Sequence, residues 1–502
     1  MSRSPSADGR PLLLFNSLGR RLEEFTPVHP PQVGVYTCGP TVYAYPHLGN
    51  LRAYVFADGL RRALEWKGYE VRQIVNITDV GHLTSDQDEG EDKMLVAALR
   101  EGRSMREIAQ TYTQAFMDDV RRLAILPATV YPRASDHVPE MIEFVKVLEA
   151  KGYTYGLPTG LYFDTGRSQD YGRLALLDRE GVREGRIESV EGKRNAADFA
   201  LWRSRVGEAR RAMEWDSPWG PGAPGWHLEC SVMSMKYLGN HFDIHTGGVD
   251  HREVHHVNEI AQSEAYLGDG EAWVRYWLHN EFLLFTREKM SKSAGGTIRL
   301  EDLIERGYHP SVFRHFTLTA HYRSKMNFSF EALDAAEASL RRLLLRVRDR
   351  RREGDGSGQR PDFHSTLERL KSEAARRYLL GMDEAVSADL NTPRALALVD
   401  AFTQDTSLDR QEVRALLEAA DTILGLGLLD TRVEDLSAKS AIEDSAVAEI
   451  ERLVQARSRA RAAARWEEAD ALRRQLKELG VQVTDTAGGT EWYPIRRQPP
   501  AG

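Results

Sequence analysis

The chain has 502 residues, 41% hydrophobic and 28% charged, which is typical of a soluble globular protein with several domains. The formal net charge of −8 argues against a general nucleic-acid coat, so any RNA contact must use local basic patches. No apolar run approaches the roughly 18 residues of a membrane span, and two cysteines exclude a disulfide scaffold. We expect a cytoplasmic protein without signal peptide or membrane contact.

The first predicted elements are a strand, a turn and a helix. Residues 33–37 are β-branched and aromatic, and Cys38-Gly39-Pro40 ends this strand because proline cannot continue a central ladder. Residues 46–50 (PHLGN) open a helix, whose start attracts phosphate, and residues 69–78 predict another strand. This order favours a parallel βαβ unit, in which ligands bind outside the carboxyl ends of the strands.

The remaining patterns predict three regions in chain order. Helical spacing covers residues 94–123 and 251–262, residues 241–248 predict a strand, and residues 127–195 have the loose pattern of an insertion. Residues 353–361 resemble a linker, residues 365–428 are helical, and a helix with short strands ends the chain. We therefore predict an α/β protein: a Rossmann-like parallel-sheet domain over residues 11–330 with an insertion at about 127–195, a helical bundle over 331–430, and a small mixed domain over 445–502.

Both cysteines lie beside candidate site segments. Cys38 ends the first strand, and Cys230 begins a predicted helix. His255 and Glu259 are four residues apart, so they share a helix face. Two thiolates, an imidazole and a carboxylate suit zinc, although two inert buried cysteines beside a polar helix would give the same pattern.

Two groups of motifs resemble a known family. PHLGN (46–50) followed by KMSKS (289–293) resembles the class I aminoacyl-tRNA synthetases, although Asn50 stands where histidine is commoner. TCGPTVY, GWHLEC, HFDIHTGG and HHVNEIAQSEA, in this order, resemble the cysteinyl-tRNA synthetase family. The resemblance runs from NSLGR near the start to GGTEW near the end.

The resemblance implies a ligase that activates L-cysteine with ATP and transfers it to the 3′-terminal ribose of tRNA(Cys), releasing pyrophosphate and AMP. It also implies a monomer, with Mg²⁺ accompanying ATP and one Zn²⁺ per chain. The zinc ligands would be Cys38, Cys230, His255 and Glu259. Zinc would select cysteine over serine, because it prefers a thiolate and a pocket cannot separate near-isosteres strongly.

The remaining site residues follow from the same resemblance. The predicted catalytic residues are His47, Lys289 and Lys292. These three would also bind ATP, together with Thr41, Gly49, Asn50 and Ser291. The predicted cysteine-binding residues are Gly39, Thr78 and Trp226. The helical bundle and end domain would bind tRNA. Basic residues at 457–465 would contact it, and Trp492 and Tyr493 would stack on unpaired bases.

Three alternatives stay open at this point. A ligase that joins cysteine to the amine of an aminosugar shares the catalytic half but would not need residues 365–492. A non-catalytic zinc or RNA-binding protein has no use for a phosphate-closing lysine pair. A small nucleotidyltransferase would be far shorter.

Overall fold

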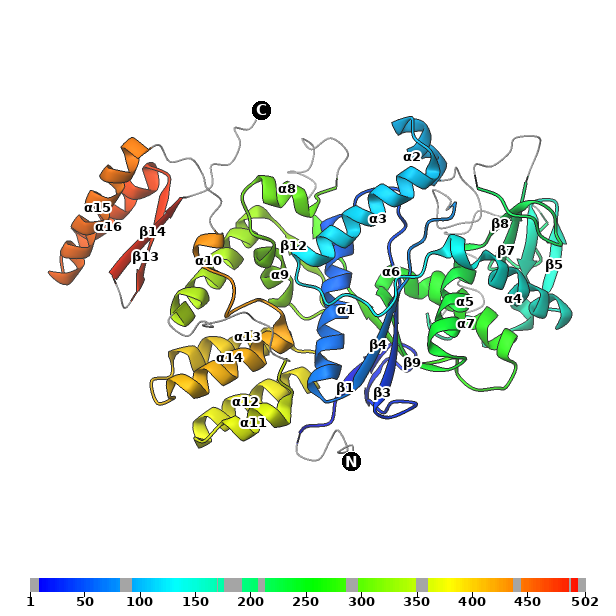
Figure 1. The fold of residues 1–502 in the computed structure, drawn as a ribbon, viewed down its shortest axis with the longest axis horizontal. Coiled ribbons are helices and arrows are strands. Elements are labelled where there is room, and N and C mark those ends of the chain that lie inside the picture. The colour runs from blue at the N-terminus through cyan, green and yellow to red at the C-terminus, as the bar shows by residue number, and fades with distance from the viewer. Residues whose placement is uncertain are drawn as a thin grey trace.

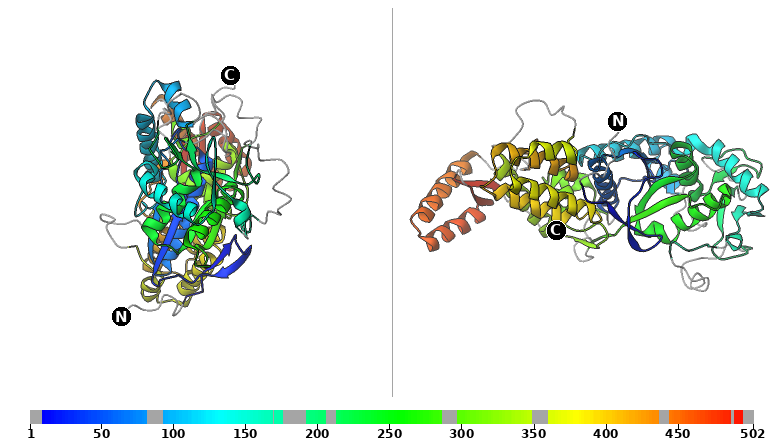
Figure 2. Two further views of the ribbon diagram at one scale, coloured as in Figure 1. Left: turned by 90° about the vertical axis from the view of Figure 1, so that its right-hand side faces the viewer. Right: turned by 90° about the horizontal axis from the view of Figure 1, so that it is seen from below.

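The structure, a computed structural model, describes residues 9–81, 93–168, 170–175, 192–205, 213–285, 297–348, 360–436, 444–486 and 489–494. The molecule is elongated, with a parallel sheet near its middle, an antiparallel sheet toward one end and helical units toward the other (Figures 1 and 2). Among the described residues, no helix has the length and apolar character needed to cross a membrane.

The central sheet is parallel and has the strand order β10-β9-β3-β4. Its strands are β3 (Gln32–Thr37), β4 (Glu70–Val75), β9 (Phe242–Gly248) and β10 (Val274–Asn280). Helix α1 (Leu48–Trp66) joins β3 to β4, which is the predicted βαβ unit. Val35 in β3 lies opposite Gln73 on one side and Ile244 on the other, so segments far apart in sequence end at one sheet edge. The predicted α/β class is confirmed.

A second sheet, antiparallel and ordered β5-β6-β7-β8, lies toward one end (Figure 1). Its strands are β5 (Thr154–Leu157), β6 (Gly160–Phe163), β7 (Phe199–Ser204) and β8 (Gly222–Pro224), and α4 (Val138–Ala150) precedes them. The sheet extends past residue 195 because β6 pairs with β7 across a long stretch of chain, which local patterns do not reveal. Gly160 is required there, since a Cβ would lie 2.0 Å from the Trp202 carbonyl oxygen.

Two stretches with continuous helical spacing are each two helices. Residues 94–123 form α2 (Lys93–Glu101) and α3 (Met105–Arg122), because Gly102 has a left-handed φ of +64° and Ser104 caps the second helix. Residues 251–262 belong to α6 (Val249–Glu253) and α7 (His255–Leu267), which meet at Val254. His255 is therefore the first residue of α7.

The chain beyond the central sheet is mainly helical. Its elements are β11 (Leu283–Phe285), α8 (Leu300–Glu305), α9 (Pro310–Leu318), β12 (Met326–Phe328), α10 (Phe330–Val347), α11 (Phe363–Arg369), α12 (Glu373–Ser387), α13 (Thr392–Gln404) and α14 (Arg410–Leu424). Buried charges join this part to the sheet domain. Asp58 in α1 accepts from Arg62 Nε at 2.7 Å and pairs with Arg314, whose Nε donates to the Leu424 carbonyl at 2.8 Å.

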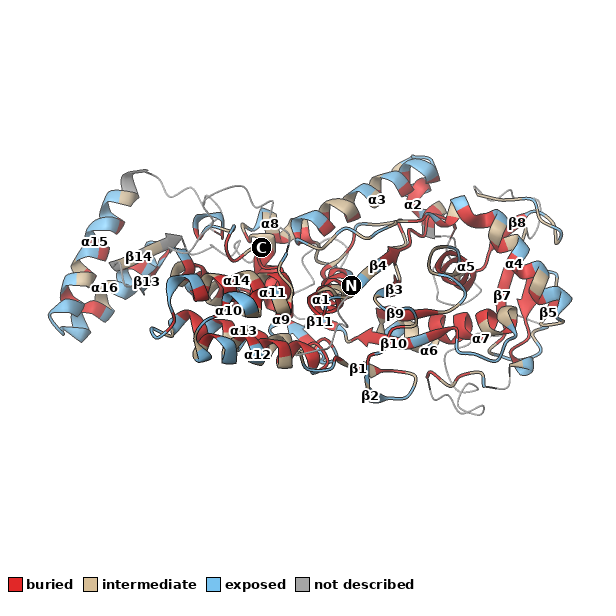
Figure 3. Ribbon diagram, turned by 60° about the horizontal axis from the view of Figure 1, so that its bottom comes forward, coloured by how far each residue is buried: buried red, intermediate tan, exposed pale blue. Residues whose placement is uncertain are grey.

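The last unit contains α15 (Asp444–Ala462), α16 (Trp466–Glu478), β13 (Val481–Thr486) and β14 (Gly489–Pro494). Its small core is separate from the others and includes Ile450, Leu476 and Val481. Much of α15 and α16 is exposed in Figure 3. The remaining elements are the helix α5 (Trp226–Leu238) and the short elements β1 (Leu13–Asn16), β2 (Arg21–Glu24), η1 (Ala134–His137), η2 (Thr165–Arg167) and η6 (Glu434–Leu436).

Candidate active site and metal centre

A cavity of about 770 Å³ lies at the carboxyl end of the parallel sheet. Cys38 and Thr41 line it after the end of β3, and His47 lines it at the start of α1. Trp226 from α5 and His255 from α7 complete part of its wall. Open parallel sheets bind ligands at this edge, so the cavity is the candidate active site.

The four predicted metal ligands meet beside this cavity. One donor atom from each of Cys38, Cys230, His255 and Glu259 lies within 4.8 Å of the other three. Cys230 Sγ lies 3.5 Å from His255 Nε2, and this nitrogen lies 2.5 Å from Glu259 Oε1. Cys38 is half-buried and the other three are buried, while Cys38 and His255 also line the cavity. The cluster therefore reaches the cavity through these two residues.

The cluster holds both anionic and cationic side chains. Burial alone would raise the pKa of the Glu259 carboxyl, but His255 and His245 outweigh it and hold that pKa well below its ordinary value. Burial would lower the pKa of His255, yet Glu259 raises it to about 10. Although burial opposes the change, the hydrogen bond with Cys230 and the charge of His245 lower the pKa of Cys38. Burial raises the pKa of Cys230. Glu259 and Cys38 are therefore anionic, and His255 holds a proton that a metal cation bound there would displace.

The donor set fits a zinc ion. Glu259 Oε2 accepts a hydrogen bond from His245 Nε2 at 2.7 Å, whereas the buried Oε1 accepts none from the residues that the structure describes. This oxygen faces an imidazole nitrogen, and two sulfurs lie close by. A metal ion would complete such a group, and sulfur, nitrogen and carboxylate ligands are those that zinc takes.

Two further histidines that the sequence prediction missed lie against this cluster. Cys38, His245, His256 and Glu259 form a second group whose donor atoms lie within 4.8 Å of one another. His256 Nε2 lies 3.2 Å from Cys38 Sγ. The histidine of HFDIHTGG and the doubled histidine at 255–256 are the sequence signals for these neighbours.

The start of α1 forms the other side of the cavity. His47 caps this helix: its Nδ1 accepts from the Asn50 N–H at 3.2 Å, and Asn50 Oδ1 accepts from the His47 N–H at 3.2 Å. Asn50 thus completes the helix cap with its side chain. Gly49 keeps this corner open, because a Cβ there would lie 3.0 Å from the His47 ring. Burial lowers the pKa of His47, so the ring is neutral near pH 7.

Of the three predicted cysteine-binding residues, two line the cavity and one does not. Trp226 lines the cavity and stacks on His255, with ring centroids 4.1 Å apart. Gly39 also lines it, and a Cβ there would lie 1.5 Å from the Asn76 carbonyl oxygen. Thr78 lies outside the cavity wall, and its buried hydroxyl donates to Glu229 Oε2 at 2.6 Å.

Lys289, Ser291 and Lys292 lie outside the described residues. The described residues on both sides of residues 286–296, Phe285 and Thr297, line the cavity. The N–H of Leu48 donates to the Ile298 carbonyl at 2.9 Å, which joins the far side of that segment to the start of α1.

The candidate tRNA-contacting side chains in the last unit differ in how far they are exposed to solvent. Arg457 is buried and donates to both Asp485 oxygens, at 2.7 and 2.9 Å. Trp492 packs against the small core, and the side chain of Tyr493 is not among those described. Trp466, which the prediction did not single out, is 58% exposed, and the Arg461 guanidinium lies 5.5 Å from its ring centroid.

Comparisons with known proteins agree with this geometry. Residues 24–338 match the family described as "tRNA synthetases class I (C) catalytic domain", and residues 444–492 match the "Cysteinyl-tRNA ligase anticodon binding domain". The chain is 46% identical to the "Cysteine--tRNA ligase" of Zymomonas mobilis, over 98% of this chain and 99% of that protein. It is 48% identical to the protein of the same name from Novosphingobium aromaticivorans, over 97% and 98%.

A solved structure shows the same fold at low sequence identity. Methionyl-tRNA synthetase of Mycobacterium tuberculosis, bound by methionyl-adenylate, superposes with a TM-score of 0.51 and 16% identity, covering 79% of this chain and 92% of that one. This match supports the fold alone. The two family matches and the nearly full-length relatives show that the chain belongs to the cysteine–tRNA ligase family of class I tRNA synthetases.

Proposed function

We propose that the protein is an ATP-dependent cysteine–tRNA ligase. It activates L-cysteine to cysteinyl-adenylate with release of pyrophosphate. It then transfers the cysteinyl group to the 3′-terminal ribose of tRNA(Cys) with release of AMP. The observation that carries this proposal is the group of Cys38, Cys230, His255 and Glu259 at the wall of a cavity in a class I synthetase fold.

The four residues would hold one Zn²⁺ per chain next to the amino-acid end of the cavity. A zinc ion bound there supplies a preference for a thiolate over an alcohol and lowers the pKa of a bound thiol. Cysteine and serine differ only by sulfur and oxygen, so the walls around Trp226 and Gly39 can contribute little to their separation. Thr78 would support this pocket indirectly, through its hydrogen bond to Glu229.

His47 would bind a phosphate oxygen of ATP. Because its Nδ1 accepts from the Asn50 N–H, the neutral ring carries its hydrogen on Nε2 and can donate it. The α1 N-terminus adds a partial positive charge to the same corner. Thr41, Gly49 and Asn50 would form the rest of the nucleotide wall on this side, and Mg²⁺ would accompany the phosphates of ATP.

Lys289, Ser291 and Lys292 would act on the phosphates of ATP. Phe285 and Thr297, the described residues before and after residues 286–296, line the cavity, which supports a role for the lysines in neutralising charge on the leaving pyrophosphate. Such a role requires positioning and charge alone, because adenylate formation needs no covalent enzyme intermediate.

The rest of the chain would serve tRNA binding. We propose a catalytic domain at residues 11–330, a tRNA-binding helical bundle at 331–430 and an anticodon-reading domain at 445–502. The match of residues 444–492 to an anticodon-binding family supports this division. It also argues against the alternative of a ligase that joins cysteine to an aminosugar, because such an enzyme would not need that region. We also propose that the protein acts as a monomer in the cytoplasm, where its two free cysteines stay reduced.

The test is ATP–pyrophosphate exchange with cysteine and serine in parallel, followed by charging of tRNA(Cys). We expect much faster exchange with cysteine than with serine. In the charging assay, we expect the cysteinyl group to be transferred to tRNA(Cys). Equal exchange with cysteine and serine, or no exchange with either amino acid, would contradict the proposal.

A further inference from the structure

The antiparallel-sheet insertion contacts the metal centre through a line of hydrogen bonds. We propose that Tyr171, from the insertion, and Asn258, from α7, are positioning residues that hold His255, through His227, in the ring form that binds the metal. This inference rests on the metal site proposed above. It concerns residues that neither bind the metal nor line the candidate active site.

The contacts run from the insertion to the metal ligand in four steps. The Tyr171 hydroxyl lies 3.4 Å from the Ala197 carbonyl oxygen and 2.7 Å from the side-chain amide of Asn258. The other end of this amide lies 3.0 Å from His227 Nε2. His227 Nδ1 lies 2.9 Å from Nδ1 of His255. His227, Asn258 and His255 are all buried, so these contacts are shielded from competing water.

The direction of donation along this line decides which nitrogen of His255 is available. A metal on Nε2 needs the lone pair of that atom, so the ring hydrogen of His255 lies on Nδ1 and is donated to His227 Nδ1. His227 then carries its own hydrogen on Nε2 and needs an acceptor at Asn258. That acceptor is the amide oxygen.

The opposite end of the line permits the same direction. The Ala197 carbonyl, 3.4 Å from the Tyr171 hydroxyl, can accept the hydroxyl hydrogen, which leaves the lone pairs of the hydroxyl oxygen for a donor. The Asn258 NH₂ group is that donor. As drawn, Oδ1 faces Tyr171 and Nδ2 faces His227, and a half-turn of the amide exchanges the two at nearly the same positions. We assign the turned orientation, because it satisfies the carbonyl and leaves Nε2 of His255 free for the metal.

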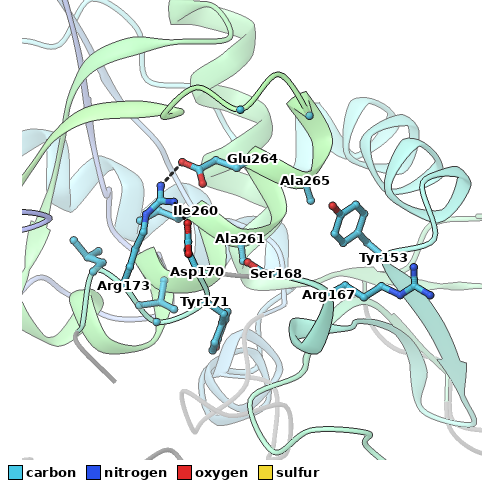
Figure 4. A pocket seen from close by; sticks show the side chains of 15 residues that line it. Tyr153, Arg167, Ser168, Asp170, Tyr171, Arg173, Ile260, Ala261, Glu264 and Ala265 are labelled. Atoms are coloured by element: carbon cyan, nitrogen blue, oxygen red, sulfur yellow. Dashed lines mark hydrogen bonds and ion pairs between the residues drawn. The ribbon is translucent and has the colours of Figure 1, made fainter. Parts of the chain in front are cut away.

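The segment that carries Tyr171 is held against α7 independently of this line. Arg173 forms an ion pair with Glu264, drawn as a dashed line in Figure 4. Between this segment and α7 lies a pocket of about 360 Å³, which Tyr171, Arg173 and Tyr153 line. The contact makes the position of the insertion part of the geometry of the metal site.

Four full-length variants test the inference. Asn258→Leu removes both hydrogen-bonding groups at similar size, whereas Asn258→Asp keeps an acceptor for His227 and offers a second oxygen to Tyr171. Tyr171→Phe removes the hydroxyl alone. Tyr153→Phe is the matched control, because Tyr153 lines the same pocket without contacting Asn258. For each protein, zinc affinity is measured by competition with a chelator, the cobalt(II) absorption spectrum is recorded after metal exchange, and the thermal midpoint is determined.

We expect Asn258→Leu to lower zinc affinity by about 10- to 100-fold, the usual scale for residues that orient a ligand, and to change the cobalt spectrum. Asn258→Asp should retain the affinity, Tyr171→Phe should lose less than Asn258→Leu, and Tyr153→Phe should match the wild type. Equal losses in Asn258→Asp and Asn258→Leu, or wild-type affinity in both Asn258→Leu and Tyr171→Phe, would overturn the inference. A wild-type chain that binds no zinc would instead refute the metal site itself.

Discussion

Replacing Glu259 by glutamine should separate the metal's role from that of the pocket walls. The side chain is fully buried, and its two oxygens lie 2.7 Å from His245 Nε2 and 2.5 Å from His255 Nε2. Glutamine has nearly the same volume, so the cavity keeps its size. The amide keeps an acceptor for His245, but its neutral oxygen is a poorer ligand than a carboxylate.

The size of the effect follows from the charge that is removed. Removing one charge from a buried pair of opposite charges costs about 3–5 kcal/mol of interaction free energy. At 1.36 kcal/mol for each factor of ten, this corresponds to about 10²- to 10⁴-fold weaker zinc binding. Cysteine activation should fall steeply with it, while serine activation, which is already poor, should change little.

The assay combines chelator competition for zinc with pyrophosphate exchange for both amino acids. Glu253→Gln is the control, because that carboxylate in α6 is exposed and forms an ion pair with Arg252. If zinc affinity and the cysteine-to-serine ratio both stay at the wild-type level in Glu259→Gln, the carboxylate neither holds the metal nor contributes to selection.

Three other predictions concern the nucleotide and tRNA ends of the molecule. Lys292→Ala should slow single-turnover adenylate formation by about 10²-fold, the scale for one charge-stabilising group, and an unchanged rate would mean that the lysine acts elsewhere. Deleting residues 446–502 should spare pyrophosphate exchange and weaken tRNA charging, because the end unit has its own core; equal loss of both activities would contradict this. Trp466→Ala should raise KM for tRNA at an unchanged melting temperature, whereas Trp492→Ala should lower the melting temperature, and the reverse pattern would show that Trp492 is the tRNA contact.

The sequence predicts the parallel sheet well because its strands are continuous buried runs. Val33, Val35 and Tyr36 are fully buried, and each β-branched or aromatic residue there is a local signal. The breaks at Gly102 and Val254 interrupt helices whose apolar spacing continues across them, so spacing alone does not locate them. The extent of the antiparallel sheet depends on pairing between distant strands, which no local pattern contains.

For the site, the residue types could be predicted but their neighbours could not. Cys38 and Cys230 are 192 positions apart, and only motif order, through the family resemblance, predicts that they lie together. The line from His227 through Asn258 to Tyr171 depends on side chains from three separate segments, so it becomes visible only in three dimensions. The sequence around Trp466 does not predict that its side chain is exposed. The exposure becomes visible only from its position at the start of α16.

We predict that a metal ion, and not the size of the pocket, selects cysteine over serine. The most direct measurement is the ratio of kcat/KM for cysteine and serine in pyrophosphate exchange, with the wild-type protein as purified, after zinc removal and after zinc is restored. We predict a large ratio that collapses on zinc removal and returns when zinc is restored. A ratio that survives in the zinc-depleted protein would show that the walls around Trp226 and Gly39 discriminate, and would contradict the role given to Cys38 and Cys230.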